Sequence, residues 1–289
     1  MVIDAHVHLY PTEVNRDPVG WASAHGETRW AQLCTRRRRD GRAVQGFPSI
    51  DELLREMDRA GVSRAVLLGW YWETADACAE QNRFYAECVR ARPDRLSAFG
   101  TVQPRAGRAA TLAALRGIRD SGLIGLGELS PHSQGYGIDD EVFQEVLALA
   151  GEWRLPVNLH VTDPNSRDYP GRCETPLEDF SRLAHAFPEV NFILAHWGGL
   201  LSLRDAAAAK LANLFYDSAA SPLMYDESVW SRILAVVPPE RVLFGSDFPL
   251  NLFPQEEGAP EMSRLVAQAR AAGAGPEIFG GNAERLFGL

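Results

Sequence analysis

Residues 2–8, VIDAHVH, open the chain with a short apolar run that carries two histidines, His6 and His8, two positions apart. In a β-strand, residues two apart project from the same face. The run therefore predicts a strand that presents both imidazoles on one side close to its C-terminal end. The rest of the sequence indicates what kind of sheet contains this strand.

Short apolar runs with strand character recur along the chain, and amphipathic stretches separate them. The strand candidates are residues 2–8, 64–70, 96–103, 124–129, 156–161, 191–197, 213–218 and 241–247. The helix candidates are residues 49–61, 76–92, 108–121, 139–154, 175–187, 200–210, 226–236 and 261–272. The first helix begins with a capping box, Ser49 and Glu52, and ends at Gly61. Alternating strands and helices in this number predict a (β/α)8 TIM barrel, with a doubly wound open sheet as the alternative.

The size and net charge of the chain limit which kinds of protein it can be. With 289 residues, 46% of them hydrophobic, and no linker or change in composition, residues 1–289 are expected to form a single domain. The net charge of −9 argues against nucleic acid and anionic membranes as partners. No apolar run approaches the roughly 18 residues of a membrane helix, and no leader precedes the first strand. We therefore expect a cytoplasmic protein with a small-molecule substrate, with assembly into a homo-oligomer left open.

The largest departure from the repeating pattern is the long loop predicted after the first strand, residues 11–47. In a TIM barrel it would lie over the catalytic face, where loops of this length often act as lids. It contains the run TRRRRDGR, residues 35–42, whose arginines either attract an anionic substrate or form an ordinary solvated loop.

Three further ionisable residues, His160, His196 and Asp247, stand at the ends of predicted strands. A single buried histidine is most often a hydrogen-bonded core residue. Four histidines and an aspartate at one rim are costly to bury together unless a metal or a reaction requires them. Imidazoles with a carboxylate suit zinc and other transition ions. The pattern predicts that His6 and His8 are adjacent ligands of a divalent metal.

The ordered set of motifs resembles the amidohydrolase superfamily, in particular its amidohydrolase 2 branch, which includes aminocarboxymuconate semialdehyde decarboxylase. The motifs are DAHVHLY at 4–10, NLHVTDP at 158–164, LAHWGG at 194–199, LFGSDFP at 243–249 and GGNAERLFGL at 280–289. The resemblance implies a TIM barrel whose metal is held by His6, His8, His160 and Asp247. It also implies that His196 is a further ligand or a general acid or base, and that a C-terminal helix contains Asn282 as a structural anchor.

Glu128 is the residue that bears on the number of metal ions. Many superfamily members bridge two ions with a carbamylated lysine at the end of strand 4, but the single lysine, Lys210, lies elsewhere. GLGELSPHSQGYG, residues 125–137, resembles the deoxyribonuclease-like hydrolases, in which a glutamate at this place contributes to the metal centre. Glu128 is thus expected to bridge two ions, with His196 on the second ion. One ion is the alternative, and so is a role for Glu128 in pairing with an arginine.

The leading functional expectation is a metal-dependent hydrolase that cleaves a small amide, lactone or ester with a metal-activated water. Asp247 and His196 are the expected catalytic residues, with Asp247 as the proton acceptor. The alternatives are a metal-dependent non-oxidative decarboxylase on the same scaffold and a non-enzymatic metal-binding module. Zn²⁺ is the expected ion and Mn²⁺ the second choice, with one or two ions per chain. The side chains expected to contact substrate, or else to pack, are Trp70, Trp72, Tyr136, Arg167 and Arg172.

Overall fold

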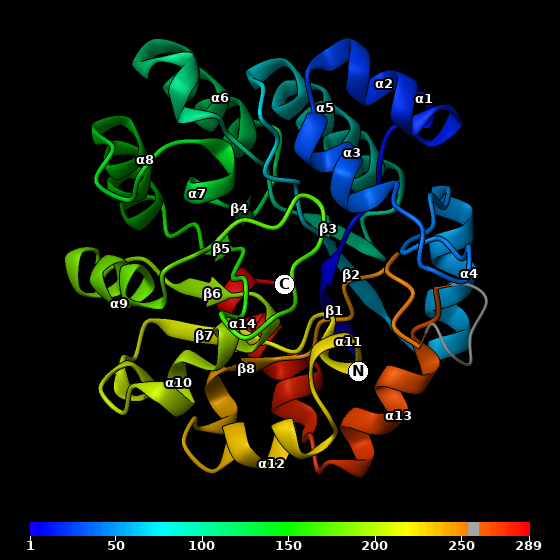
Figure 1. Cartoon of the computed structure of the whole chain (residues 1–289). Helices are drawn as coiled ribbons and strands as arrows, with labels where there is room; N and C mark the ends of the chain where they lie inside the picture. Colours follow the sequence, from blue (N-terminus) through cyan, green and yellow to red (C-terminus); the bar gives the residue numbers. More distant parts are fainter. Residues whose placement is uncertain (254–259) are drawn as a thin grey trace.

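Parallel strands form a central ring that is surrounded by helices (Figure 1). The computed structural model describes residues 1–253 and 260–289. Within these residues the strands are β1 Ile3–Val7, β2 Arg64–Leu67, β3 Leu96–Ala98, β4 Leu126–Leu129, β5 Val157–Leu159, β6 Phe192–Leu194, β7 Leu214–Asp217 and β8 Val242–Leu243. Each strand falls inside a run predicted from the sequence.

The ring closes through single bridges between two sheets. Strands β1 to β3 form one parallel sheet and β4 to β8 another. A bridge between Gly100 and Leu126 joins β3 to β4, and one between Val7 and Phe248 joins the end of β8 to β1. The chain thus forms the closed TIM barrel rather than the open sheet.

The helices that cover the barrel also agree closely with the sequence pattern. They are α4 Ile50–Ala60, α5 Ala75–Ala91, α6 Arg108–Asp120, α7 Pro131–Gln134, α8 Glu141–Glu152, α9 Leu177–Ala186, α10 Leu201–Arg204, α11 Ser221–Met224, α12 Ser228–Leu234, α13 Ser263–Ala271 and α14 Asn282–Phe287. The predicted capping box of α4 is present, with the Ser49 backbone N–H donating to Glu52 at 2.7 Å. The helix predicted over 200–210 is shorter, because the Asp205 side chain accepts a hydrogen bond from the Ala207 backbone at 2.8 Å and favours a turn.

The long connection after β1 contains three short helices that the sequence pattern did not indicate. They are α1 Thr12–Arg16, α2 Pro18–His25 and α3 Thr28–Cys34. The aromatic residues Trp21 and Trp30 of this connection pack with Trp72 in a separate buried cluster. The buried carboxylate of Glu27 accepts hydrogen bonds from Thr74 at 2.9 and 2.7 Å and so joins the connection to the start of α5. The connection is therefore a packed part of the structure.

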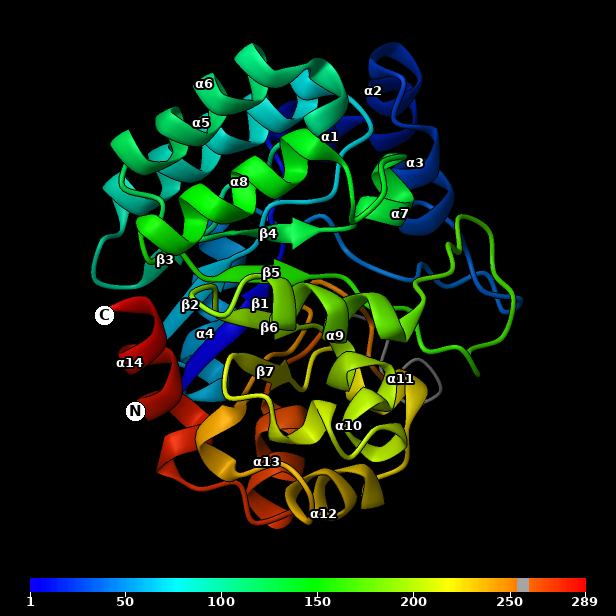
Figure 2. The ribbon, with the colours of Figure 1, turned by 90° about the vertical axis from the view of Figure 1, so that its left-hand side faces the viewer.

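Helix α14 closes the end of the barrel that lies near both chain termini (Figure 2). Its Phe287 ring lies 5.2 Å from the ring of Phe99, in a buried cluster that draws residues from six strands or strand ends. Asn282 donates hydrogen bonds at 2.7 Å to the carbonyls of Pro239 and Val242, which fits the anchoring role implied for it. This packing leaves the opposite end of the barrel for the functional residues.

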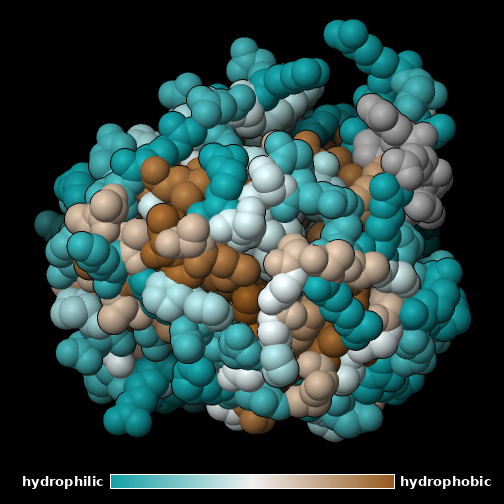
Figure 3. All heavy atoms as spheres, turned by 90° about the horizontal axis from the view of Figure 1, so that it is seen from below, coloured by the Kyte–Doolittle hydropathy of each residue, from teal (hydrophilic) through white to brown (hydrophobic). Residues whose placement is uncertain are grey.

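The outer surface is mixed in character. The face in Figure 3 is mainly hydrophilic around its edges, and hydrophobic residues gather toward its middle. Among the residues that the structure describes, no helix combines the length and apolar character needed to cross a membrane.

Candidate metal centre and cavity

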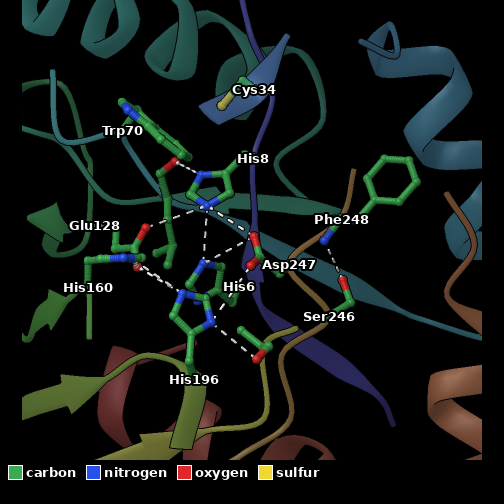
Figure 4. A network of polar contacts seen from close by, with 12 residues as sticks. His6, His8, Cys34, Trp70, Glu128, His160, His196, Ser246, Asp247 and Phe248 are labelled. Atoms are coloured by element: carbon green, nitrogen blue, oxygen red, sulfur yellow. Dashed lines mark hydrogen bonds and ion pairs between the residues drawn. The ribbon is translucent and has the colours of Figure 1, made fainter. Parts of the chain in front are cut away.

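His6 in β1 and His8 just after it each direct one ring nitrogen toward a common point (Figure 4). The Nε2 atoms of His6 and His8 lie 3.1 Å apart. The opposite nitrogens are occupied: Nδ1 of His6 lies 2.9 Å from the Asp217 carboxylate, and Nδ1 of His8 lies 3.0 Å from the Leu68 carbonyl. These acceptors place the proton on Nδ1 and leave the Nε2 lone pairs free, which is the arrangement found in metal-ligating histidines. The donor set therefore fits a divalent cation.

Glu128 lies between the β1 pair and two further histidines. Its Oε2 is 3.8 Å from His8 Nε2, and its Oε1 is 2.8 Å from His160 Nδ1 and 3.6 Å from His196 Nε2. The neighbouring strands β5 and β6 bring His160 and His196 to this point, with His160 directly after β5 and His196 one residue further beyond the end of β6. Glu128 belongs to two groups of potential ligands, one with His6 and His8 and one with His160 and His196.

Asp247 lies beside the two histidines of the first group. Its Oδ1 lies 3.5 Å from His8 Nε2 and 3.7 Å from His6 Nε2. Tetrahedral ligands about 2.1 Å from one ion lie about 3.4 Å from each other. The Nε2 atoms of His6 and His8 and Oδ1 of Asp247 lie 3.1 to 3.7 Å from one another and so approximate this spacing around one ion. Glu128 belongs with His160 and His196 to the second group of potential ligands.

Both Asp247 and His196 have left-handed backbone conformations, with φ of 64° and 58°. This region is unfavourable for residues other than glycine and is maintained only by surrounding contacts. The backbone N–H of Asp247 donates to the His6 carbonyl at 2.9 Å, and that of His196 donates to Asp217 at 3.0 Å. These contacts turn the two side chains back toward the β1 histidines.

Burial and mutual charges shift the pKa values of the cluster. Burial acts to lower the pKa of His6, but the Asp217 carboxylate outweighs it and raises the pKa to about 10. Burial likewise opposes ionisation of Glu128, yet the charge and hydrogen bond of His160 hold its pKa well below the ordinary value. Burial and the neighbouring His6 lower the pKa of His8. Glu128 therefore stays ionised, which suits a site for a cation.

Asp217, at the end of β7, is a functional residue that the sequence reasoning missed. It lies in the strand candidate 213–218, and its only sequence signal is a carboxylate at a strand end. It contacts His6 through Oδ2 and the His196 backbone through Oδ1, so one buried carboxylate orients two members of the site.

We expect Asp217→Asn to weaken divalent metal binding by about 10- to 100-fold, because it removes the charge that orients and polarises His6. The measurement is metal affinity by competition with a chromophoric chelator. Asp168→Asn, an exposed position on the loop after β5, is the control. Unchanged affinity in Asp217→Asn would show that this carboxylate serves the fold alone.

The candidate ligands open into a cavity of about 1130 Å³. Trp70 and Arg167, two of the predicted substrate contacts, line it. The described lining does not include Trp72, Tyr136 or Arg172. The Trp72 indole donates to Gln81 at 2.6 Å inside the aromatic cluster, and Arg172 Nε donates to Ser166 at 3.0 Å.

Tyr136 has a similar internal role, since its hydroxyl donates to Gln134 at 3.0 Å and its ring packs on Phe143. The lining contains further residues, among them arginines of the 35–42 run, which the sequence already offered as possible contacts for an anion. Those with aromatic or cationic side chains are Arg36, Arg38, Tyr71, Tyr169, Tyr225, Arg232 and Phe253. They come from loops far apart in the sequence, so only the fold brings them together.

The closed barrel and the candidate ligands at its strand ends are typical of metal-dependent TIM-barrel proteins. Comparison with known proteins identifies the family. A family model described as Amidohydrolase matches residues 3–289. The chain therefore belongs to the amidohydrolase 2 family, as its motifs indicated. None of the curated proteins compared with the chain matches it.

Solved structures with the same fold cover almost the whole chain. A 5-carboxyvanillate decarboxylase from Novosphingobium aromaticivorans, with bound manganese and 3-methoxy-4-hydroxy-5-nitrobenzoic acid, has a TM-score of 0.76 at 18% identity, covering 100% of this chain and 97% of that one. A 2,6-dihydroxybenzoate decarboxylase from Rhizobium has a TM-score of 0.68 at 18% identity, covering 100% and 98%. A 4-oxalomesaconate hydratase from Rhodopseudomonas palustris has a TM-score of 0.68 at 16% identity, covering 100% and 96%. At these identities the similarity concerns the fold.

Proposed function

We propose that this protein is a metal-dependent, non-oxidative decarboxylase of a small aromatic carboxylic acid. The observation that carries the proposal is the composition of the cavity, in which every candidate metal ligand except His6 shares one lining with aromatic rings and arginines. The solved decarboxylases of 5-carboxyvanillate and 2,6-dihydroxybenzoate support it, because they have the same fold and act on aromatic acids. This proposal replaces hydrolysis as the leading function.

Two stacked rings provide a flat surface beside the candidate ligands. Trp70 and Tyr71 lie with ring centroids 4.3 Å apart and an interplanar angle of 24°. The Tyr71 ring is also 4.8 Å from that of His160. Stacked aromatic pairs gain about 0.5–1.5 kcal/mol beyond simple burial. A planar substrate ring would therefore bind against Tyr71 with its carboxylate near the ligand cluster.

In the proposed reaction, the bond between the ring carbon and the carboxylate carbon breaks and CO2 leaves. The electron pair stays on the ring carbon, which accepts a proton. A bound divalent cation would supply a Lewis acid for the substrate oxygens. Asp247 delivers the proton, since it lines the cavity and its Oδ2 lies 3.8 Å from His196 Nδ1, which exchanges the proton with it.

We propose Mn²⁺ as the ion, with Zn²⁺ as the second choice. Imidazole and carboxylate ligands suit both ions. The 5-carboxyvanillate decarboxylase structures contain manganese, which favours Mn²⁺ for a related reaction.

Titration of Mn²⁺ into stripped protein tests the number of ions. We expect full activity at one equivalent, because the donor atoms of His6, His8 and Asp247 have the spacing of ligands around one ion and Glu128 lies beside them. Glu128→Gln should weaken this binding. Saturation only at two equivalents, lost in Glu128→Gln, would contradict this and establish the bridging role expected from the sequence.

Hydrolysis of a small amide, lactone or ester is the competing function, because Glu128 is shared by two ligand groups as in two-metal hydrolytic centres. The test is to incubate the Mn²⁺-loaded protein with hydroxylated benzoates, aromatic dicarboxylates, lactones and amides. The proposal predicts CO2 release from aromatic acids. Hydrolysis without CO2 release would refute it.

A further inference from the structure

One wall of the cavity is apolar. It consists of Leu223 and Met224 in α11, after β7, and of Leu250 and Phe253, after β8. Strands β7 and β8 are neighbours in the sheet, so the segments that follow them lie side by side. All four side chains pack on the main core but are only half-buried. Apolar surface that faces water gains free energy when an apolar group of a ligand covers it.

Helix α11, which contributes the first two of these side chains, is held in place at both ends by polar contacts. At its start, the Ser221 hydroxyl accepts a hydrogen bond from the Trp197 indole at 2.9 Å, and both residues are buried. Just after its end, the Tyr225 hydroxyl donates to the buried carboxylate of Asp163 at 2.7 Å. The wall is therefore preorganised, which lowers the entropic cost of binding against it.

The apolar wall begins beside Asp247, the proposed proton donor. The Leu250 backbone N–H donates to the Asp247 carbonyl at 2.9 Å, so Leu250 lies one turn further along the chain. The backbone N–H of Ala220, which precedes α11, donates to the Ser246 carbonyl at 3.4 Å and joins the two segments near Asp247. A substrate ring that receives a proton from Asp247 therefore directs a substituent toward this wall.

The size of the cavity leaves space for such a substituent. Its volume of about 1130 Å³ lies above the range of about 300–1,000 Å³ that is common for ligand pockets, and a ring with a single carboxylate is smaller than most ligands of such pockets. The wall side chains offer no strong hydrogen-bond donor or acceptor. A polar substituent placed against them would lose its hydrogen bonds to water without replacement, so the wall favours an apolar one.

We propose that α11 and the segment after β8 form an apolar subsite for an alkyl group on the substrate ring. The substrate is then an alkyl-substituted aromatic carboxylic acid. Its carboxylate lies at the ligand cluster, and its alkyl chain contacts Leu223 and Met224. This inference rests on the proposed function for the identity of the aromatic acid.

Calorimetric binding to the Mn²⁺-loaded protein tests the subsite without requiring turnover. The probes are benzoates with alkyl chains from methyl to butyl at ring position 3 or 4, and the matching 3-hydroxypropyl benzoates, in which a hydroxyl replaces the last methyl group of butyl. At the better position, wild-type affinity should rise about two- to fourfold per methylene group. The hydroxypropyl compound should lose most of this gain.

Leu223→Asn/Met224→Gln keeps the approximate side-chain sizes but makes the wall polar. It should reduce the gain to less than about 1.5-fold per methylene group, and Met224→Gln alone should reduce it to an intermediate value. The gain is a ratio of affinities within one variant, so a general loss of affinity cancels. Melting temperature and metal content are measured for every variant.

Leu149→Asn/Leu234→Asn is the matched control, because these half-buried leucines lie in α8 and α12 and are absent from the described lining. This variant should keep the gain. Affinity that does not rise with chain length in the wild type, or a rise that survives in Leu223→Asn/Met224→Gln, would overturn the subsite. If the gain depends on Leu223 and Met224 but no aromatic acid loses CO2, the subsite stands and the proposed decarboxylation fails.

Discussion

Removing the bound metal should abolish turnover, and adding Mn²⁺ back should restore it. The expected loss is the largest in this account, because the bound cation would supply the Lewis acid of the proposed reaction. The metal should also raise the melting temperature, since a ligand that binds only the folded state stabilises that state. Activity and melting curves of stripped and reloaded protein measure both effects.

Two controls make this result specific. Elemental analysis of freshly purified protein should find a divalent ion in at least a stoichiometric amount. Reloading with Mg²⁺, which prefers oxygen ligands, should restore less activity than reloading with Mn²⁺. Full activity in the presence of chelator, with no stoichiometric metal in the fresh protein, would refute the assignment of the ligand cluster.

Asp247→Asn should lower kcat by about 10²-fold or more while the fold persists. The amide has nearly the size of the carboxylate but cannot transfer a proton. Asparagine also tolerates the left-handed backbone conformation of residue 247, so the local conformation should survive. Steady-state CO2 release at saturating substrate provides the measurement.

Because Asp247 also belongs to the candidate ligand set, metal content must be measured alongside kcat. The comparison is therefore made at saturating Mn²⁺, with Asp168→Asn as the control for a lost surface carboxylate. Near-normal turnover in fully loaded Asp247→Asn would exclude proton transfer by this residue. Turnover of His196→Asn, measured in the same way, would then show whether His196 transfers the proton without Asp247.

The barrel could be predicted from the sequence because its signals are local. Each strand is a short apolar run, and helices such as α4 carry their own capping residues, Ser49 and Glu52. The resemblance to the amidohydrolase 2 branch was confirmed by the family match over residues 3–289. The three helices after β1 were harder to predict, since they are only five to eight residues long and depend on packing.

The candidate site was only partly visible in the sequence. The structure brings together six residues that lie near the C-terminal ends of strands, namely His6, His8, Glu128, His160, His196 and Asp247. Asp217 acts through His6 and carries no motif of its own. Trp72 and Tyr136 resemble substrate contacts in sequence, but which side of a loop faces the cavity depends on tertiary packing. The same limit applies to the arginine run, in which Arg36 and Arg38 line the cavity while Arg37 and Arg39 are exposed.

The most direct test of metal-dependent decarboxylation is the fate of the carboxyl group in heavy water. Mn²⁺-loaded protein is incubated in D2O with carboxyl-labelled aromatic acids, including dicarboxylates, and the products are analysed by mass spectrometry and NMR. The account predicts one labelled CO2 per product molecule and one deuterium at the ring carbon that carried the carboxyl group. Stripped protein should release no labelled CO2 and incorporate no deuterium. Aromatic acids recovered unchanged from the loaded protein, while lactones or amides are hydrolysed by it, would contradict the account.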